Sequence, residues 1–343
     1  MSTHLLIARS QVDASVLADL IPPPCAASSA AALRWTAGDD AALVFELVLP
    51  GALLRGAKQI IPCLSCLARQ DYAYQFALEF KTAKSGAVGT TWLSPIGRIE
   101  LAVNAIQLET PPVRSSIDVL VLDEELESAI LKLQVFSAEP RDVQVASALV
   151  SVSISSSRTS GKKEWVDGPT GVQMDIPVPA KSQLEQDPDL GSRICSPTSV
   201  SMVLDHYGCQ TAALEVAALA YHPLHDLYGV WPAALYAASR WGLLGYLLEF
   251  PSWNAVQWLL ERRIPVVASI RYKEGELQDA AQPATSGHLV VVRGYSDDVV
   301  QVNDPAAASA AAVCRFYARR EFEKVWLERG ALGYVIFPPA GPA

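Results

Sequence analysis

The sequence has no long hydrophobic run. None of its apolar stretches approaches the ~18–20 uncharged residues that a membrane-spanning helix needs, so we expect no membrane partner. The segment from Met1 to Arg9 has no basic start and only a short apolar patch, unlike a secretory signal. These two absences together predict a soluble, cytoplasmic protein.

Basic residues are also scarce. The chain has 27 Lys and Arg against 36 Asp and Glu, a formal net charge of -9, and no basic stripe. Because a nucleic-acid interface needs clustered positive charge, we expect no nucleic-acid partner.

Cysteine and histidine are too sparse to suggest a metal site. Cys63 and Cys66 form the only close cysteine pair, with no second pair and no histidine nearby in sequence. Without a signal peptide a structural disulfide is not expected either, so we predict that the pair packs in a core. His222 and His225 are three residues apart, but nothing nearby completes a metal site, and we expect surface or loop positions. The sequence predicts no metal and no cofactor.

The length and composition predict two domains. The chain has 343 residues, half of them hydrophobic, and we place the domains at residues 1–160 and 170–340. Between residues 35 and 154 apolar residues alternate, which predicts an antiparallel β-sandwich. The alternating sets are Tyr72, Tyr74, Phe76, Leu78 and Phe80; Ile99, Leu101 and Val103; and Leu131, Leu133 and Val135. Since this half has only one histidine and scattered acids, its role is either a binding module or a structural support.

A polar, small-residue segment from Ser155 to Lys163 predicts a linker. After it, residues 212–221, 232–240 and 253–262 have helical patterns, and a β-rich tail follows. We therefore expect a fragment starting near Asp167 to fold alone.

The stretch from Ile194 to Gly208 predicts a helix. Ser196 is a favoured N-cap residue, Pro197 suits the first turn, and Gly208 suits a left-handed C-terminal position. Cys195 then lies at the positive end of the helix, where a thiolate is stabilised. Cys195 is therefore a candidate nucleophile, although a free cysteine is also a common small core residue.

A thiol nucleophile needs a base and a group that orients the base. His288 enters an apolar, β-branched strand, and Asp304 ends the next predicted strand. A three-residue loop at 295–297 would place His288 directly opposite Asp304, whereas a two-residue turn at 296–297 would put them on opposite faces.

Gln183, upstream of the cysteine, is a candidate oxyanion donor beside the backbone N–H of Cys195. Gln186 is a rival for this role, and both glutamines could instead be solvated.

Several ordered motifs of the second half resemble a known family. They are Val178-Pro179, Ser182-Gln183, Cys195-Ser196-Pro197-Thr198-Ser199, Met202-Val203-Leu204, Tyr228-Gly229-Val230-Trp231-Pro232, residues 264–270, Gly287-His288-Leu289 and Val302-Asn303-Asp304-Pro305. From about Met174 to Pro338 the chain resembles the double-glycine, bacteriocin-processing class of papain-fold cysteine peptidases, in its stand-alone branch without the transporter.

The resemblance implies an α+β fold, a papain-like peptidase domain preceded here by the β-sandwich. It also implies that Cys195 is the nucleophile, His288 the general base, Asp304 the orienting residue and Gln183 the oxyanion donor. Two features depart from the family: Ser196 stands where many members have glycine, and the loop from Gln183 to Cys195 is long.

The leading hypothesis is a cysteine peptidase or amide hydrolase that acts on a peptide or protein through an acyl-thioester, without a cofactor. An acyl transferase with the same triad is the first alternative. A non-enzymatic binding module on the same fold is the second, although the intact Cys, His and Asp set argues against it.

Overall fold

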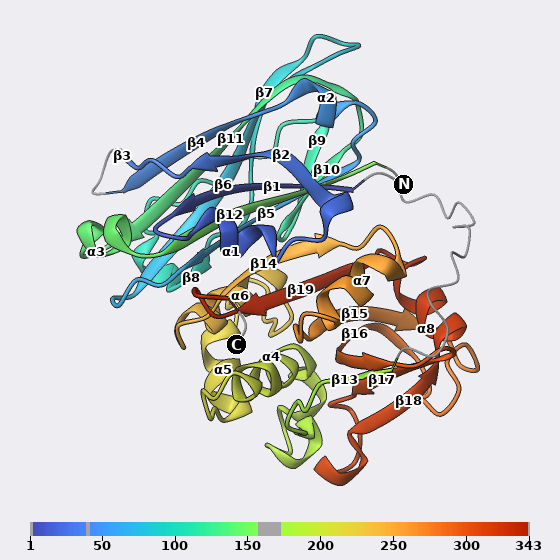
Figure 1. Ribbon diagram of the computed structural model, residues 1–343. Helices are drawn as coiled ribbons and strands as arrows, with labels where there is room; N and C mark the ends of the chain where they lie inside the picture. The colour runs from blue at the N-terminus through green and yellow to red at the C-terminus, as the bar shows by residue number, and fades with distance from the viewer. Residues whose placement is uncertain (1–2, 39–41, 157–172, 342–343) are drawn as a thin grey trace.

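The computed structural model describes residues 3–38, 42–156 and 173–341. Two sheets come from the first half of the chain, and a third sheet with most of the helices comes from the second (Figure 1). The α+β class and the β-sandwich are therefore as predicted. In the described ranges no helix is both long and apolar enough to cross a membrane.

The first sheet of the sandwich is antiparallel except for the parallel pair β1 and β2. Its strands, in spatial order, are β2 (Ala26–Ala32), β1 (Thr3–Ser10), β12 (Ala148–Ser155), β5 (Gln59–Cys66), β10 (Val119–Leu122) and β9 (Val113–Ser116).

The second sheet is antiparallel and packs on the first. Its order is β3 (Thr36–Ala37), β4 (Leu43–Leu49), β11 (Leu126–Ser137), β6 (Tyr72–Thr82) and β7 (Val88–Trp92), with β8 (Ile96–Gly97) also paired to β6. The alternating residues Leu131, Leu133 and Val135 are buried in the core between the sheets, together with Leu64 and Val150 of the first sheet. Short helices flank the sandwich: α1 (Ala14–Ala18), η1 (Pro23–Cys25), α2 (Gly51–Leu54) and α3 (Pro140–Val145).

One predicted strand is wrong. Ile99–Leu101 forms a 3₁₀ turn, η2, and Val103 is 83% exposed. Gly97, with φ of 91°, ends the preceding strand, so these three apolar residues alternate without a neighbouring strand to pair with.

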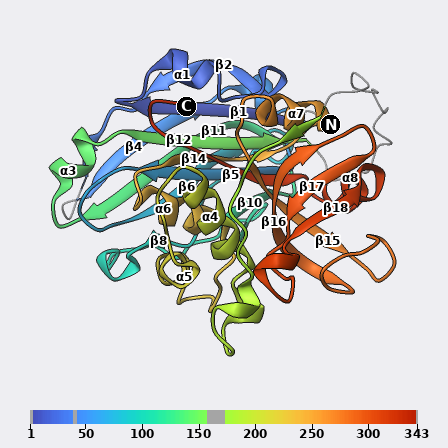
Figure 2. The same ribbon diagram turned by 60° about the horizontal axis from the view of Figure 1, so that its bottom comes forward.

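The third sheet holds the second half together. Its order is β14 (Leu244–Glu249), β19 (Leu332–Phe337), β15 (Val266–Tyr272), β16 (Thr285–Tyr295), β17 (Val299–Asn303) and β18 (Cys314–Ala318), with β13 (Met174–Asp175) paired to β16. Figure 2 shows α4, α5 and α6 on one side of this half and β15 to β18 on the other.

The predicted helices of the second half are present, within about two residues of their expected ends. The helical elements are η3 (Gln183–Glu185), η4 (Gly191–Arg193), α4 (Cys195–His206), α5 (Ala213–Ala220), α6 (Trp231–Ser239), α7 (Trp253–Leu260), η5 (Ala310–Ala312) and α8 (Arg319–Trp326).

The two halves share one apolar core. Leu5, Ile61 and Leu149 of the first sheet belong to the same buried cluster as Leu244 and Val335 of the third. A polar contact crosses the boundary as well, because Gln59 Nε2 donates to Glu249 Oε1 at 2.8 Å. This shared core argues against our expectation that a fragment starting near Asp167 folds alone, since the fragment would expose that surface. Most of the predicted linker, from residue 157 on, lies outside the described residues.

Candidate active site

Helix α4 begins at Cys195 itself, two residues earlier than the sequence pattern predicts. Ser196 is not the N-cap: its buried hydroxyl lies 3.2 Å from the Tyr334 hydroxyl, and the N-cap is Ile194. The carboxyl end is as expected, because Gly208 has φ of 86° and its N–H donates to the Asp205 carbonyl at 2.9 Å. Cys195 is therefore the first residue of the helix, and its thiol lies at the positive end.

A hydrogen bond fixes α4 against the strand that carries the histidine. Ser199 Oγ donates to the Leu289 carbonyl at 3.1 Å, and both groups are buried. Leu289 directly follows His288 in β16, so this contact holds the start of α4 beside the imidazole.

His288 and Asp304 form a buried pair. His288 Nε2 lies 2.7 Å from Asp304 Oδ1, and the two side chains are 3% and 0% exposed. The strand register differs from both predicted ones: Val291 pairs with Asn303, and a bulge interrupts the ladder near Arg293. Asp304 therefore follows at a position diagonal to His288 on the same face, which still lets the side chains meet.

Three further contacts hold the Asp304 region in place. Tyr317 donates its hydroxyl to Asp304 Oδ2 at 2.8 Å, and the Ala306 N–H donates to Oδ1 at 3.0 Å. The Asn303 amide donates to the Val178 carbonyl at 3.0 Å, which ties the Val178-Pro179 motif to this strand end. Burial raises the pKa of Asp304, but the His288 charge and the hydrogen bonds from His288, Tyr317 and Ala306 outweigh it, so the pKa is lowered.

The electrostatics favour an ion pair between thiolate and imidazolium. Burial opposes the charge on His288, yet Asp304 and the hydrogen bond to Cys195 raise the pKa of His288 above its ordinary value. Burial likewise opposes the Cys195 thiolate, but the hydrogen bond and charge of His288 lower the thiol pKa. Backbone hydrogen bonds from Leu289 and Ser196 add to this effect. The arrangement can thus supply a nucleophile and a proton donor at neutral pH.

Gln183 lies close to this site through its backbone. Its N–H donates to the Pro305 carbonyl, next to Asp304, at 2.8 Å. A Cβ on Gly191 would lie 3.0 Å from the Gln183 carbonyl, so the glycine permits the close approach of the segment that leads into Cys195. The Gln183 side chain is 4% exposed, and its amide oxygen has no hydrogen-bond partner among the described residues.

Gln186, the alternative oxyanion donor, makes a hydrogen bond to the backbone. Gln186 Nε2 donates to the Ser182 carbonyl at 2.9 Å, where it stabilises the short helix η3. This bond uses one of the two N–H groups of the Gln186 amide and holds the side chain against η3. Gln183 and Gln186 therefore both stay candidates for the oxyanion donor, and Gln183 is the one whose backbone is bonded beside Asp304.

The other cysteines and histidines lie elsewhere. All six cysteines are free, and Cys25, Cys63 and Cys66 are buried, with burial raising the pKa of each thiol to about 12. The packing role predicted for the Cys63 and Cys66 pair is therefore confirmed. Both histidines lie in the loop between α5 and α6, in line with the expected surface or loop positions; His222 is buried there, at 2% exposed, and His225 is exposed. In the described part of the chain no three His, Cys, Asp or Glu side chains gather as a metal site would require.

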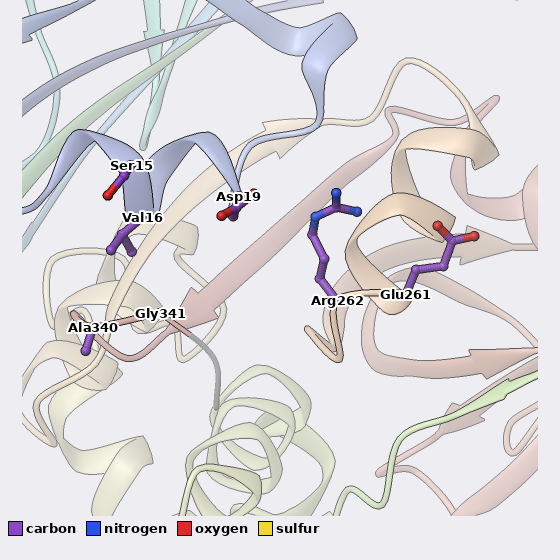
Figure 3. A pocket seen from close by; sticks show the side chains of 7 residues that line it. All are labelled: Ser15, Val16, Asp19, Glu261, Arg262, Ala340 and Gly341. Carbon is purple, nitrogen blue, oxygen red and sulfur yellow. The ribbon is translucent and has the colours of Figure 1, made fainter.

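A pocket of about 590 Å³ lies apart from Cys195, His288 and Asp304 (Figure 3). It is lined by Ser15, Val16, Asp19, Glu261, Arg262, Ala340 and Gly341. None of the predicted site residues lines it, and its polar residues lack a buried nucleophile and base. We therefore place the candidate site at Cys195.

Sequence reasoning missed Tyr317 and Tyr334. Tyr317 belongs to β18, which pairs with β17 just before Asp304, and this pairing brings its hydroxyl to the carboxylate. A strand predicted at residues 314–318 and paired with the Asp304 strand would have pointed to Tyr317. No local pattern marks Tyr334, because its partner Ser196 is 138 residues away.

A helix that begins with a cysteine and faces a His–Asp pair on an antiparallel sheet defines the papain-like fold of cysteine peptidases. Residues 175–334 match the model of the Peptidase_C39 like family, which confirms the resemblance of this half. A comparison with curated proteins gave no match.

Three solved structures are similar to this half of the chain. A C39-like peptidase from Bacillus anthracis is 19% identical with a TM-score of 0.39, covering 48% of this chain and 97% of its own. A double glycine motif protease from an AMS/PCAT transporter, in complex with the leader peptide, is 17% identical with a TM-score of 0.33, covering 49% and 99%. The peptidase domain of Streptococcus ComA is 16% identical with a TM-score of 0.32, covering 43% and 93%.

Proposed function

We propose that the protein is a cysteine peptidase that uses Cys195 as nucleophile and a Cys-His-Asp triad. The observation that carries the proposal is the buried His288–Asp304 pair, joined at 2.7 Å and hydrogen-bonded through His288 to a thiol at the start of a helix. The peptidase family match over residues 175–334 supports the same reaction class.

In the proposed reaction the Cys195 thiolate attacks the carbonyl carbon of a peptide bond and forms a tetrahedral oxyanion. The backbone N–H of Cys195 and the Gln183 amide donate hydrogen bonds to that oxyanion. His288 gives its proton to the leaving amine as the C–N bond breaks, which leaves a thioester on Cys195. A water molecule, deprotonated by His288, then attacks the thioester and releases the acid and the thiol.

Asp304 acts through His288. Its carboxylate fixes the ring orientation and stabilises the imidazolium, while Tyr317 and the Ala306 N–H fix the carboxylate. The proposed substrates are peptides or proteins, and the proposed domains remain residues 1–160 and 170–340.

A peptide library incubated with wild type and with Cys195→Ser tests this function. Mass spectrometry should show new amino termini with wild type and none with the variant. Products that carry an added amine instead of water would indicate the acyl transferase. No product of either kind, over a broad library, would favour the non-enzymatic alternative.

A further inference from the structure

The segment between α5 and α6, residues 221–231, contacts Arg193 in the segment that leads into the nucleophile. Arg193, two residues before Cys195, pairs with the Asp226 carboxylate at 2.8 Å, and its guanidinium lies 5.2 Å from the centre of the Tyr228 ring. Leu224 and Leu227 of this segment are 52% and 40% exposed. We name residues 221–231 the wall loop, because they contact Arg193 and carry exposed apolar side chains.

The β-sandwich holds the wall loop from the other side. Asp118 Oδ2 accepts a hydrogen bond from the Trp231 N–H at 2.9 Å, and the Pro95 carbonyl lies 3.0 Å from His222 Nε2. Ser94 Oγ adds a third contact, 2.9 Å from Nε2 of His225, the next histidine along the loop. Both ends of the loop therefore depend on residues from the first half of the chain.

Of these three contacts, the one from Asp118 is to the first residue of α6. Asp118 is 8% exposed, and its carboxyl lies at the amino end of α6, where the N–H groups and the helix dipole favour a negative acceptor. Burial raises the pKa of Asp118 to about 7, against the hydrogen bond from Trp231.

We propose that Asp118 is a positioning residue: it fixes the start of α6 and thereby the wall loop as one side of the substrate cleft. The proposal rests on the proposed peptidase function. The proposal gives the β-sandwich a direct part in substrate binding. Without the sandwich, the wall loop would keep only its contacts to the peptidase half.

The test compares Asp118→Ala, Asp118→Asn and Arg240→Ala. Arg240 follows the opposite end of α6, and it also binds the sandwich, donating to the Ala68 carbonyl at 2.6 Å. It therefore controls for a general loosening of the two halves. Asparagine keeps an oxygen that can accept from Trp231 N–H, so it should restore most of what alanine loses.

Two readouts are measured on the full chain. Hydrogen exchange of the wall-loop amides should be faster in Asp118→Ala than in wild type, and unchanged in Arg240→Ala. With a peptide substrate, Asp118→Ala should raise KM roughly tenfold, the equivalent of one lost hydrogen bond, with a smaller change in kcat. Labelling of Cys195 by iodoacetamide, which is too small to need the wall, should stay within about twofold.

Unchanged exchange in Asp118→Ala would overturn the positioning role. Faster exchange with an unchanged KM would overturn the cleft role. Equal effects of Asp118→Ala and Arg240→Ala would mean that Asp118 only docks the two halves. A wild type without turnover would refute the proposed function instead, and the exchange data would still decide the positioning role.

Discussion

Replacing Asp304 with asparagine should abolish the ion pair at Cys195. Asp304 raises the pKa of His288, and the resulting imidazolium lowers the pKa of the Cys195 thiol. Asparagine can still accept from the Ala306 N–H with its one oxygen and can donate its amide to the Tyr317 hydroxyl, but it carries no charge. Burial, the largest influence on both groups, then lowers the pKa of His288 and raises that of Cys195.

The size of the effect follows from these directions. In wild type the thiolate–imidazolium ion pair exists over the pH range between the lowered pKa of the Cys195 thiol and the raised pKa of the His288 imidazole. At pH 6.5 a thiol with an ordinary pKa of ~8.5 is only about 1% thiolate. The alkylation rate of Cys195 at that pH should therefore fall strongly in Asp304→Asn, toward about a hundredfold.

The assay is the pH dependence of iodoacetamide labelling at Cys195, read by mass spectrometry with the buried Cys25 and Cys63 as slow internal references. Circular dichroism confirms that the variant is folded. Asp298→Asn is the matched control, since Asp298 is exposed and lies at the opposite end of the same hairpin strand. An unchanged labelling profile in folded Asp304→Asn would refute the chain of effects from Asp304 to Cys195.

Three further predictions test other parts of the account. Gln183→Ala should lower kcat ~10²–10³-fold with a smaller change in KM and near-normal Cys195 labelling, whereas Gln186→Ala should turn over nearly normally; the reverse order would move the oxyanion role to Gln186. Tyr317→Phe keeps the ring stacked on Phe322 but removes one hydrogen bond to a buried carboxylate, so urea unfolding should show a loss of about 1.5–3 kcal/mol, and no loss would mean that the contact is not formed. A fragment starting at Asp167 should bind a hydrophobic dye and aggregate because it exposes the shared core; a soluble, cooperatively unfolding fragment would show that the halves are independent.

Local patterns were sufficient to predict most of the fold and the residues that meet at the site. The alternation of Leu131, Leu133 and Val135 and the glycine at position 208 reflect local backbone geometry, and the structure has both features. Cys195, His288 and Asp304 could be proposed as nucleophile, base and orienting acid because each lies in or next to an element that the local pattern predicts: Cys195 at the start of a helix, His288 in a strand and Asp304 at the end of the next strand.

Features that depend on distant partners were not predictable in this way. Serine is a residue type favoured at the N-cap, but the Ser196 hydroxyl contacts the hydroxyl of Tyr334, which is distant in sequence. The hairpin register is altered by a bulge near Arg293 that the loop length does not reveal. The roles of Tyr317 and Asp118 depend on contacts with Asp304 and Trp231 that only the folded chain creates.

The most direct test of the central claim is the detection of the covalent intermediate. Wild type mixed rapidly with a cleavable peptide ester or amide, and quenched in acid, should gain the mass of the acyl group on the peptide that contains Cys195. Hydroxylamine should remove the adduct, as expected for a thioester, and Cys195→Ser should show no such thioester. Turnover without any adduct at Cys195, or continued cleavage by Cys195→Ser, would contradict the assignment of Cys195 as the nucleophile.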